Sequence, residues 1–436
     1  MSTKLICGSS RVSSQPLNGF DLKQHHELFP HSFVYQRVLD EEKIIDSLQE
    51  MLRINPYFSG RIVSHEKASG RVILNNGGAE FSVERIEKNI PKYGIDNPLK
   101  KNSEYFCPLV NTVGFSEKTP LLKVRLFQFN DGSILSMTAS HQLTDGAGLF
   151  EFMKDWAAVA NGREPGFREH DRFALTHNFE GAEKSLLNRL RELANPGLEE
   201  NHSANEVPIT KIIRISQALI RRIMEEQRTE KKGGAWVSAQ DVLTALLWKN
   251  LIDFNRIDKD EKISLLTAYN IRRLLSLPPN YVGNAVTNRL IDLLVKNVMD
   301  LSVVGVARVL RESIESLKKE DCLNDLMFWD GLLNEEKQQS FFFQKTIPNN
   351  WVVINNLSKF GWDKVDFGGE PVWFDIPAFP NVNRRVFILP SPLGNDFDCH
   401  VCLSEGEMEV FEKKMTNAFP GEILVSPVCK PLVSQG

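Results

Sequence analysis

The sequence predicts a mixed α/β fold, and three observations lead to this class. Segments in which apolar and polar residues alternate are interspersed with segments whose apolar residues recur at helical spacing, and the two kinds do not alternate strictly. No segment repeats at a fixed period. Hydrophobic residues make up 42% and charged residues 25% of the 436 residues, which is ordinary for a globular chain of two or three domains, or of two large ones.

The first quarter of the chain is expected to combine short strands with one long helix. A strand is predicted at Phe33–Val38. A helix follows from about Asp40 to Arg53, because its apolar residues share one face and acidic residues stand in its first turn, where the helix dipole favours them. Asn55-Pro56 ends this helix. Two short strands follow, at 60–63 and 71–74.

A β-hairpin in mid-chain leads into the most informative stretch of the sequence. Leu121–Phe129 and Ser133–Thr138 are predicted strands, and Asn130-Asp131-Gly132 between them supplies the positive φ that a tight turn requires. Apolar residues at helical spacing then predict a helix from about Leu149 to Ala157. The loop at 140–148 therefore lies between a strand and a helix, where a rigid scaffold can hold a reactive side chain.

The second half of the chain is expected to mix strands and helices after a long polar stretch from Asn161 to about Val207. Ser238-Ala239-Gln240-Asp241 is a variant of the capping box and opens a strongly apolar helix, which is typical of core packing. The other strands are expected at 209–215, 263–269, 351–354, 386–389 and 398–403, and the other helices at 216–228, 303–317 and 407–418.

His141 is the candidate for chemistry in the 140–148 loop. Imidazole titrates near neutral pH, so it can take a proton from an alcohol, amine or thiol and return it to a leaving group. Asp145 could accept the Nδ1 proton of the ring, or it could pair elsewhere and hold the loop. Gly146 and Gly148 leave room for a substrate to approach the backbone. The structural alternative is that a histidine at the end of a strand simply makes hydrogen bonds, since a histidine with an aspartate four positions on also arises by chance.

Composition argues against several classes of function. The formal net charge is −4 and no dense Lys/Arg cluster occurs, which argues against a nucleic-acid partner. Cys399 and Cys402 look like half of a metal site, but the second pair that structural zinc needs is missing, so no metal is expected. The six cysteines fit reduced thiols. No leader and no membrane-length apolar stretch is present, so a cytoplasmic protein without a membrane span is expected.

In its motifs the sequence resembles the BAHD acyltransferases, the acyl-CoA-dependent family within the chloramphenicol acetyltransferase-like superfamily. The HxxxDG motif of this family is matched fully by His141–Gly146. The family's DFGWG-type turn is matched by Asp366–Pro371, which keeps the first three residues and the proline, lacks the tryptophan and is one residue shorter. Weaker matches in the right order are Leu17–Asp21, the helix before Pro56 with Gly60-Arg61-Ile62, Ser238–Trp248, Leu277–Asn284, and Pro390-Ser391-Pro392 before Met408–Glu412.

The resemblance implies two chloramphenicol acetyltransferase-like domains, each a mixed sheet with helices. They would span residues 1–175 and 208–436, joined by a crossover at 176–207. Acyl-CoA and a small-molecule acceptor would enter a channel between the domains from opposite faces and meet at His141. The family works in secondary metabolism, and we expect a monomer without a permanently bound cofactor, with acyl-CoA as co-substrate. The residues that contact CoA are not assigned.

The resemblance also implies the mechanism. His141 would act as general base on a hydroxyl, or less often an amine, which attacks the thioester directly without an acyl-enzyme. The absence of a Gly-x-Ser-x-Gly elbow agrees with this mechanism. Asp145 would point away from the reaction and pair with an arginine, for which Arg272 is the best match and Arg273 the next. Asp145, Gly146 and Arg272 would then shape the loop.

Asp366 and Gly368 would lie away from the reacting atoms and serve the fold. The altered turn around them leaves open a second reading, a binding protein on the same fold that has lost the chemistry. A third is a condensation enzyme of the same superfamily, which would carry a doubled histidine. Ser140 precedes His141 here and no carrier domain is attached, which argues against condensation.

Overall fold

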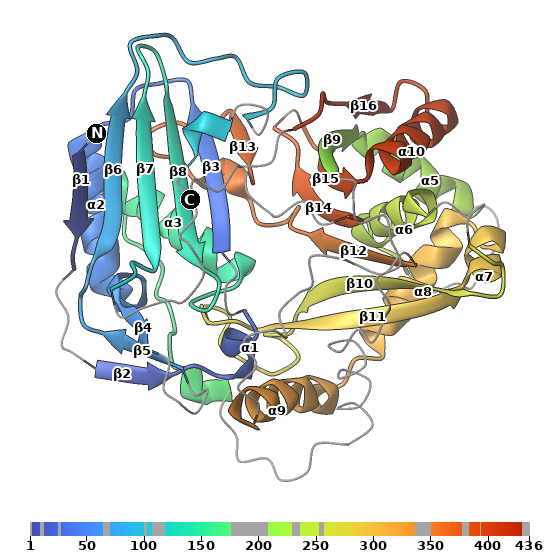
Figure 1. The fold of residues 1–436 in the computed structure, drawn as a ribbon, viewed down its shortest axis with the longest axis horizontal. Coiled ribbons are helices and arrows are strands. Elements are labelled where there is room, and N and C mark those ends of the chain that lie inside the picture. Colours follow the sequence, from blue (N-terminus) through green and yellow to red (C-terminus); the bar gives the residue numbers. More distant parts are fainter. Residues whose placement is uncertain are drawn as a thin grey trace.

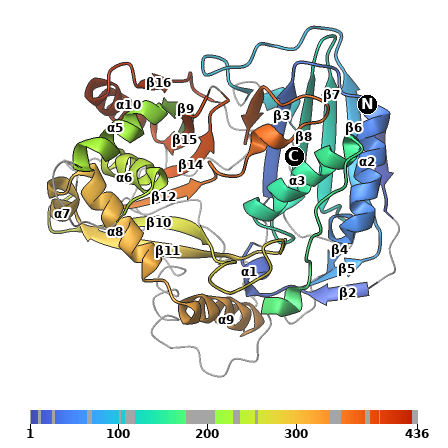
Figure 2. The ribbon, with the colours of Figure 1, turned by 180° about the vertical axis from the view of Figure 1, so that it is seen from behind.

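The computed structural model describes residues 2–8, 13–24, 28–63, 70–99, 103–106, 118–175, 208–228, 236–252, 257–335, 350–376, 383–392 and 394–429. It confirms a mixed α/β fold, with two large sheets that lie side by side in Figure 1 and in the reverse view of Figure 2. The crossover predicted at 176–207 lies outside the described residues. Among the helices that are described, none is both long and apolar enough to span a bilayer.

The first large sheet has six strands in the order β1-β6-β7-β8-β3-β13, and only β6 and β7 run parallel. Helices α2 (Glu41–Ile54) and α3 (Gly146–Ala160) cover one of its faces (Figure 2). The strands are β1 (Ser2–Ile6), β6 (Ala79–Arg85), β7 (Leu122–Gln128), β8 (Ser133–Ser140), β3 (Leu28–Tyr35) and β13 (Trp373–Asp375).

A three-stranded sheet extends this half of the molecule, in the order β2-β5-β4. Its strands are β2 (Ser13–Pro16), β5 (Arg71–Leu74) and β4 (Arg61–Val63). The short helix α1 (Gly19–Leu22) follows β2 and lies against α9 (Lys319–Glu335), which comes from the other half of the chain (Figure 1). Helix α1 thereby reaches the boundary between the two halves.

The second large sheet has seven strands in the order β11-β10-β12-β14-β15-β9-β16. The pairs β10–β12 and β12–β14 are parallel and the others antiparallel. The strands are β11 (Val286–Leu294), β10 (Lys262–Asn270), β12 (Trp351–Asn356), β14 (Arg385–Pro390), β15 (Phe397–Leu403), β9 (Ile209–Ile215) and β16 (Ile423–Val425). Besides α9, the described helices of this half are α5 (Gln217–Arg228), α6 (Ala239–Leu251), α7 (Val295–Asp300), α8 (Val303–Glu315) and α10 (Glu405–Ala418).

Helix α6 shows why these residues form these elements. Ser238 accepts from the Asp241 backbone N–H, and the Asp241 side chain accepts from the Ser238 backbone in return, so both bonds of the predicted capping box are present. Val242, Leu246 and Trp248 are fully buried, as expected for a helix that is apolar nearly all round. Local sequence therefore determines both the start of this helix and its place in the core.

Strand β13 links the two halves of the chain. It belongs by sequence to the second half but pairs antiparallel with β3 of the first sheet, Phe374 opposite Phe33. The sheet composition thus departs from the sequence order at this strand, and the domain boundaries at 175 and 208 stay a prediction.

Cys399 lies in the core of the second half, where burial raises the pKa of its thiol well above its usual value. In the described part of the chain, no group of three or more His, Cys, Asp or Glu side chains is placed to hold a metal.

Candidate functional site

His141 follows the last residue of β8 directly. Strand β8 is paired on both sides, with β3 and with β7, so the position of its carboxyl end is well determined. Leu143 N–H donates to the Ser140 carbonyl at 3.1 Å, which turns the chain away from the sheet. The His141 side chain is half-buried at this turn.

Asn284, from the segment before β11, holds the imidazole and determines its tautomer. Asn284 Nδ2 lies 2.8 Å from the His141 carbonyl oxygen and 2.9 Å from Asp21 Oδ1. A backbone carbonyl oxygen is always an acceptor, and so is a carboxylate oxygen. The part of the Asn284 amide that faces these two oxygens is therefore its NH₂ group, the donor. Asn284 Oδ1 therefore faces His141 Nδ1, 3.1 Å away, and Nδ1 carries the proton. The neutral ring then has its lone pair on Nε2.

Asp145 is the N-cap of α3 and forms a buried ion pair. Its two oxygens accept from Gly148 N–H at 3.0 Å, from Ala285 N–H at 3.0 Å, and from Arg272 at 2.7 and 2.9 Å. None of these donors belongs to His141. Burial by itself raises the pKa of the Asp145 carboxyl, but the Arg272 charge and the hydrogen bonds outweigh burial, and the pKa lies below its ordinary value.

Arg272 rather than Arg273 is the partner of Asp145. Arg272 also donates to the carbonyls of Tyr281 and Gly283 at 2.8 Å each, whereas Arg273 is exposed. One guanidinium therefore joins the cap of α3 to the 281–284 turn, which carries Asn284. The two supports of the loop, at its His141 end and at its Asp145 end, come from the same turn of the second half.

The two glycines of the 140–148 loop, Gly146 and Gly148, fit tight packing. A Cβ on Gly148 would lie 2.6 Å from the Val282 carbonyl oxygen, which is backbone and cannot move aside. A Cβ on Gly146 would lie 2.8 Å from Cε2 of Phe360. Both glycines thus let α3 approach segments of the second half closely.

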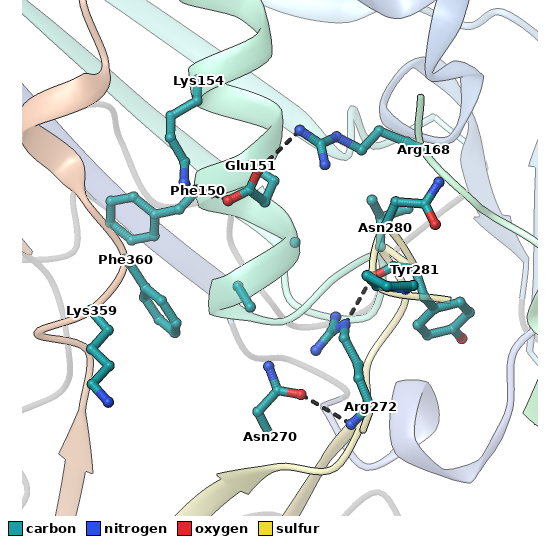
Figure 3. A pocket seen from close by; sticks show the side chains of 14 residues that line it. Phe150, Glu151, Lys154, Arg168, Asn270, Arg272, Asn280, Tyr281, Lys359 and Phe360 are labelled. Carbon is teal, nitrogen blue, oxygen red and sulfur yellow. Dashed lines mark hydrogen bonds and ion pairs between the residues drawn. The ribbon is translucent and has the colours of Figure 1, made fainter. Parts of the chain in front are cut away.

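A cavity of about 400 Å³ opens beside the first turns of α3 (Figure 3). Four basic residues and one acidic residue line it, together with aromatic and aliphatic groups. The lining residues are Ala147, Gly148, Phe150, Glu151, Lys154, Arg168, Asn270, Arg272, Pro279, Asn280, Tyr281, Val282, Lys359 and Phe360. His141 is not among them, so a channel that reaches His141 stays a prediction.

The charges of the cavity are partly compensated. Glu151 pairs with Lys154 and with Arg168, and Arg168 also pairs with Asp155. Lys359 is exposed and makes no ion pair with any residue that the structure describes. Figure 3 shows the carboxamide nitrogen of Asn270 directed toward the space between α3 and the Arg272 segment. The cavity therefore offers hydrogen-bond donors and an excess of positive charge.

Asp366 and Gly368 are far from His141. The Asp366 carbonyl accepts from Asn161 Nδ2 at 2.5 Å, and Asn161 is the C-cap of α3. Phe367 packs its ring 5.0 Å from that of Trp156, and Gly368 has φ +89°. At 1.5 Å per residue α3 is about 22 Å long, so this turn lies at the opposite end of the helix from Asp145.

Three residues near the His141 loop were not identified from the sequence: Asn284, Asp21, and Arg172, which forms an ion pair with Asp21. The first two lie in segments that carry the family resemblance, Leu17–Asp21 and Leu277–Asn284. The sequence therefore pointed to these segments but assigned no role to either residue. Arg172 belongs to a polar stretch without a motif, and nothing in the local sequence distinguishes it.

Comparisons with known proteins match most of the chain. The sequence model of the Transferase family matches residues 20–418. Minovincinine 19-hydroxy-O-acetyltransferase of Catharanthus roseus is 22% identical, over 94% of this chain and 95% of the relative. Hydroxycinnamoyl-CoA:piscidic acid hydroxycinnamoyltransferase of Actaea racemosa is 26% identical, over 88% and 91%.

Solved structures show the same fold. Vinorine synthase superposes with a TM-score of 0.69 at 19% identity, over 94% of this chain and 95% of that chain. TRI101 of F. graminearum, in its complex with ethyl coenzyme A, gives 0.72 at 15% identity, over 95% and 100%. The match over residues 20–418 covers most of the sequence, and we conclude that this protein belongs to the Transferase family, as an acyltransferase of the BAHD type.

Proposed function

We propose that the protein transfers an acyl group from acyl-CoA to a hydroxyl group of a small-molecule acceptor, and less readily to an amine. The names of relatives support the reaction, since two are O-acetyltransferases, and a structural neighbour was solved with a coenzyme A compound. The single observation that carries the proposal is the hydrogen bond between His141 Nδ1 and Asn284 Oδ1, because the tautomer it selects has a basic Nε2.

The reaction would proceed by direct attack. His141 Nε2 takes the proton of the acceptor hydroxyl while the oxygen attacks the thioester carbonyl, which gives a tetrahedral oxyanion. Collapse of this intermediate breaks the C–S bond, and the imidazolium returns the proton to the CoA thiolate. Asn284 Oδ1 accepts a hydrogen bond from Nδ1–H throughout, so it also stabilises the imidazolium. No acyl-enzyme forms, and no serine or cysteine nucleophile is required.

Asp145, Gly146 and Arg272 would support the loop rather than relay charge, because the hydrogen bonds of Asp145 go to Arg272 and to backbone N–H groups. We assign Asp366 and Gly368 to packing at the far end of α3. The cavity beside α3 suits a substrate group that has an apolar part and a negative charge, since Phe150 and Phe360 line it together with basic residues.

The test is acyl-CoA turnover by the purified protein. A screen of acyl-CoAs against alcohols and amines, read by mass spectrometry and by thiol release, should find a productive pair. His141→Ala should abolish that activity while the circular dichroism stays the same. A variant that retains the full rate would show that His141 is not the base.

The same experiment separates the two other readings. A binding protein without chemistry would show a rise in melting temperature with acyl-CoA and no turnover. A condensation enzyme would form amides from carrier-bound substrates. The fold alone is shared with a condensation domain of the MokA polyketide synthase, at a TM-score of 0.60 and 12% identity, and the HxxxD motif here carries Ser140 in place of a second histidine.

We also propose that the protein acts as a cytoplasmic monomer without a resident cofactor. Only six cysteines in 436 residues support a reducing compartment. Light scattering of the purified protein and fluorescence microscopy of a tagged chain would test the two statements separately.

A further inference from the structure

An ion pair lies behind Asn284, on the side away from the imidazole. Asp21 comes from α1 and Arg172 from the 3₁₀ turn Arg172–Leu175, and the Nε–Oδ2 distance is 3.1 Å. Both side chains are completely buried. A buried pair of this kind contributes little net stability, because desolvation offsets the attraction, so stability alone is a weak explanation for it.

The surroundings of Asp21 make it an acceptor on both oxygens. Oδ1 accepts from Asn284 Nδ2 at 2.9 Å and from the Asn284 backbone N–H at 3.4 Å. Oδ2 accepts from the Asn18 backbone N–H at 3.3 Å and faces the Arg172 guanidinium. Burial holds the pKa of this carboxyl above its ordinary value, although the Arg172 charge and the hydrogen bonds from Asn284 and Asn18 oppose that rise. All four groups are donors, so both oxygens of Asp21 face them as acceptors.

We propose that Asp21, held by Arg172, is a positioning residue that fixes the amide orientation of Asn284 and thereby the tautomer of His141. This inference rests on the proposed role of His141 as base. If the Asn284 amide rotated by half a turn, its oxygen would take the place of its nitrogen. That oxygen would then lie 2.9 Å from Asp21 Oδ1 and 2.8 Å from the His141 carbonyl oxygen. The nitrogen would then face Nδ1, which would have to accept, and the proton would move to Nε2.

Arg172 also contacts the catalytic loop directly. Its Nη2 donates to the Leu143 carbonyl at 2.5 Å, two residues after His141. Its guanidinium also lies over the Tyr57 ring, with the central carbon 5.0 Å from the ring centroid. Asp21 and Arg172 therefore tie the His141 loop to the Asn284 turn, although the two segments are more than a hundred residues apart in the chain.

The test compares two buried Arg–Asp pairs. Asp21→Asn removes the carboxylate behind Asn284. Asp398→Asn is the matched control, because Asp398 pairs with Arg214 at 2.6 and 2.8 Å in the second sheet, both side chains buried. Both variants should lower the melting temperature. Only Asp21→Asn should lower kcat, by about 10- to 100-fold with KM nearly unchanged, the size expected when a group that orients a reactive side chain is lost.

The tautomer is measured without any substrate, so this measurement tests the role of Asp21 even if the proposed reaction is wrong. Protein labelled with ¹⁵N-histidine reports the protonation of each ring nitrogen, and a His141→Gln spectrum identifies the signal among the nine histidines. The wild type should show a protonated Nδ1 at neutral pH, and Asp21→Asn a mixture. A wild-type ring protonated on Nε2, or an unchanged ring in Asp21→Asn, would overturn the proposal.

A second pair of variants covers the case in which Asp21→Asn does not fold. Asp21→Glu keeps the charge beside Arg172 but displaces the oxygens, so it should fold and still lose kcat. If Asp21 acts through Asn284, then adding Asp21→Glu to Asn284→Leu should lower kcat no further. Independent, multiplicative losses would instead show that Asp21 acts by another route.

Discussion

Replacement of Asp145 by alanine should destabilise the fold strongly, and the structure allows the size to be worked out. The change removes the acceptor of four hydrogen bonds and the counter-ion of Arg272. Arg272, whose exposed fraction is only 8%, would keep its two carbonyl partners but no negative charge. The α3 helix would also lose its N-cap side chain.

The two losses have known sizes. Leaving a buried charge without its partner costs about 3–5 kcal/mol. Loss of an N-cap side chain costs about 1 kcal/mol. The expected decrease in the free energy of unfolding is therefore about 4–6 kcal/mol, which is a large part of the ~5–15 kcal/mol that holds a typical protein folded.

Urea unfolding of the wild type, Asp145→Ala, Arg272→Met and the double variant measures this decrease. The double variant should be more stable than the sum of the single losses predicts, because it buries no unpaired charge. Acid unfolding gives a second reading. The pKa of Asp145 lies below its ordinary value, so its stabilisation is present above pH about 4 and lost as pH falls through the folded-state pKa. A loss below about 1 kcal/mol in Asp145→Ala, with additive single variants, would refute the structural role of the pair.

Three further predictions concern the neighbours of the loop. Asn284→Asp should shift the acid limb of the pH profile of kcat/KM upward by about one to three units, because a carboxylate beside Nδ1 favours the charged His141 ring, which is not a base. Lys359→Ala should raise KM for a negatively charged substrate severalfold and leave kcat nearly unchanged, as steady-state kinetics will show. Gly148→Ala should lower the free energy of unfolding by about 1–3 kcal/mol in urea titration, because its Cβ would meet the Val282 carbonyl 2.6 Å away.

Each of these has a control in the chain. Asn284→Leu should lower the rate without the upward shift of the acid limb. Lys364→Ala removes an exposed lysine near Lys359 that does not line the cavity, and its KM should match the wild type. Gly406→Ala, in the first turn of α10, meets nothing within 4 Å and should be neutral or slightly stabilising. Equal effects in a variant and its control would contradict the corresponding argument.

The elements that the sequence predicts well are those with local signals. The helix expected at 40–53 is α2, at 41–54, because its acidic first turn and the following proline are local. The hairpin expected at 121–138 is β7 and β8, because the Asn-Asp-Gly turn is local as well. Strand β11 and helix α9 were not predicted. In β11 only two of nine side chains are buried, so its sequence lacks the alternation that identifies a strand.

The motif residues themselves were identified from the sequence. Arg272 was named as the partner of Asp145 only through the family resemblance, and Asn284, the partner of His141, was not identified. His141 and Asp145 stand out by spacing, and the chain alone left open whether Asp145 holds the histidine or pairs elsewhere. The structure places Arg272 on Asp145, and Asn284 on His141, across 127 and 143 residues of sequence. A shift of one residue would exchange Arg272 for Arg273, and no local pattern distinguishes the two.

The sequence by itself determined the fold class, the family resemblance and the loop that carries His141, because apolar spacing, capping residues and turn residues act within a few positions of each other. Only the tertiary structure decided that β13 joins the first sheet, and that the Asp21–Arg172 ion pair contacts Asn284. These contacts depend on how two sheets pack side by side. Packing brings together polar groups from distant segments, and the energy of each such contact comes from desolvation and geometry that no single stretch of chain contains.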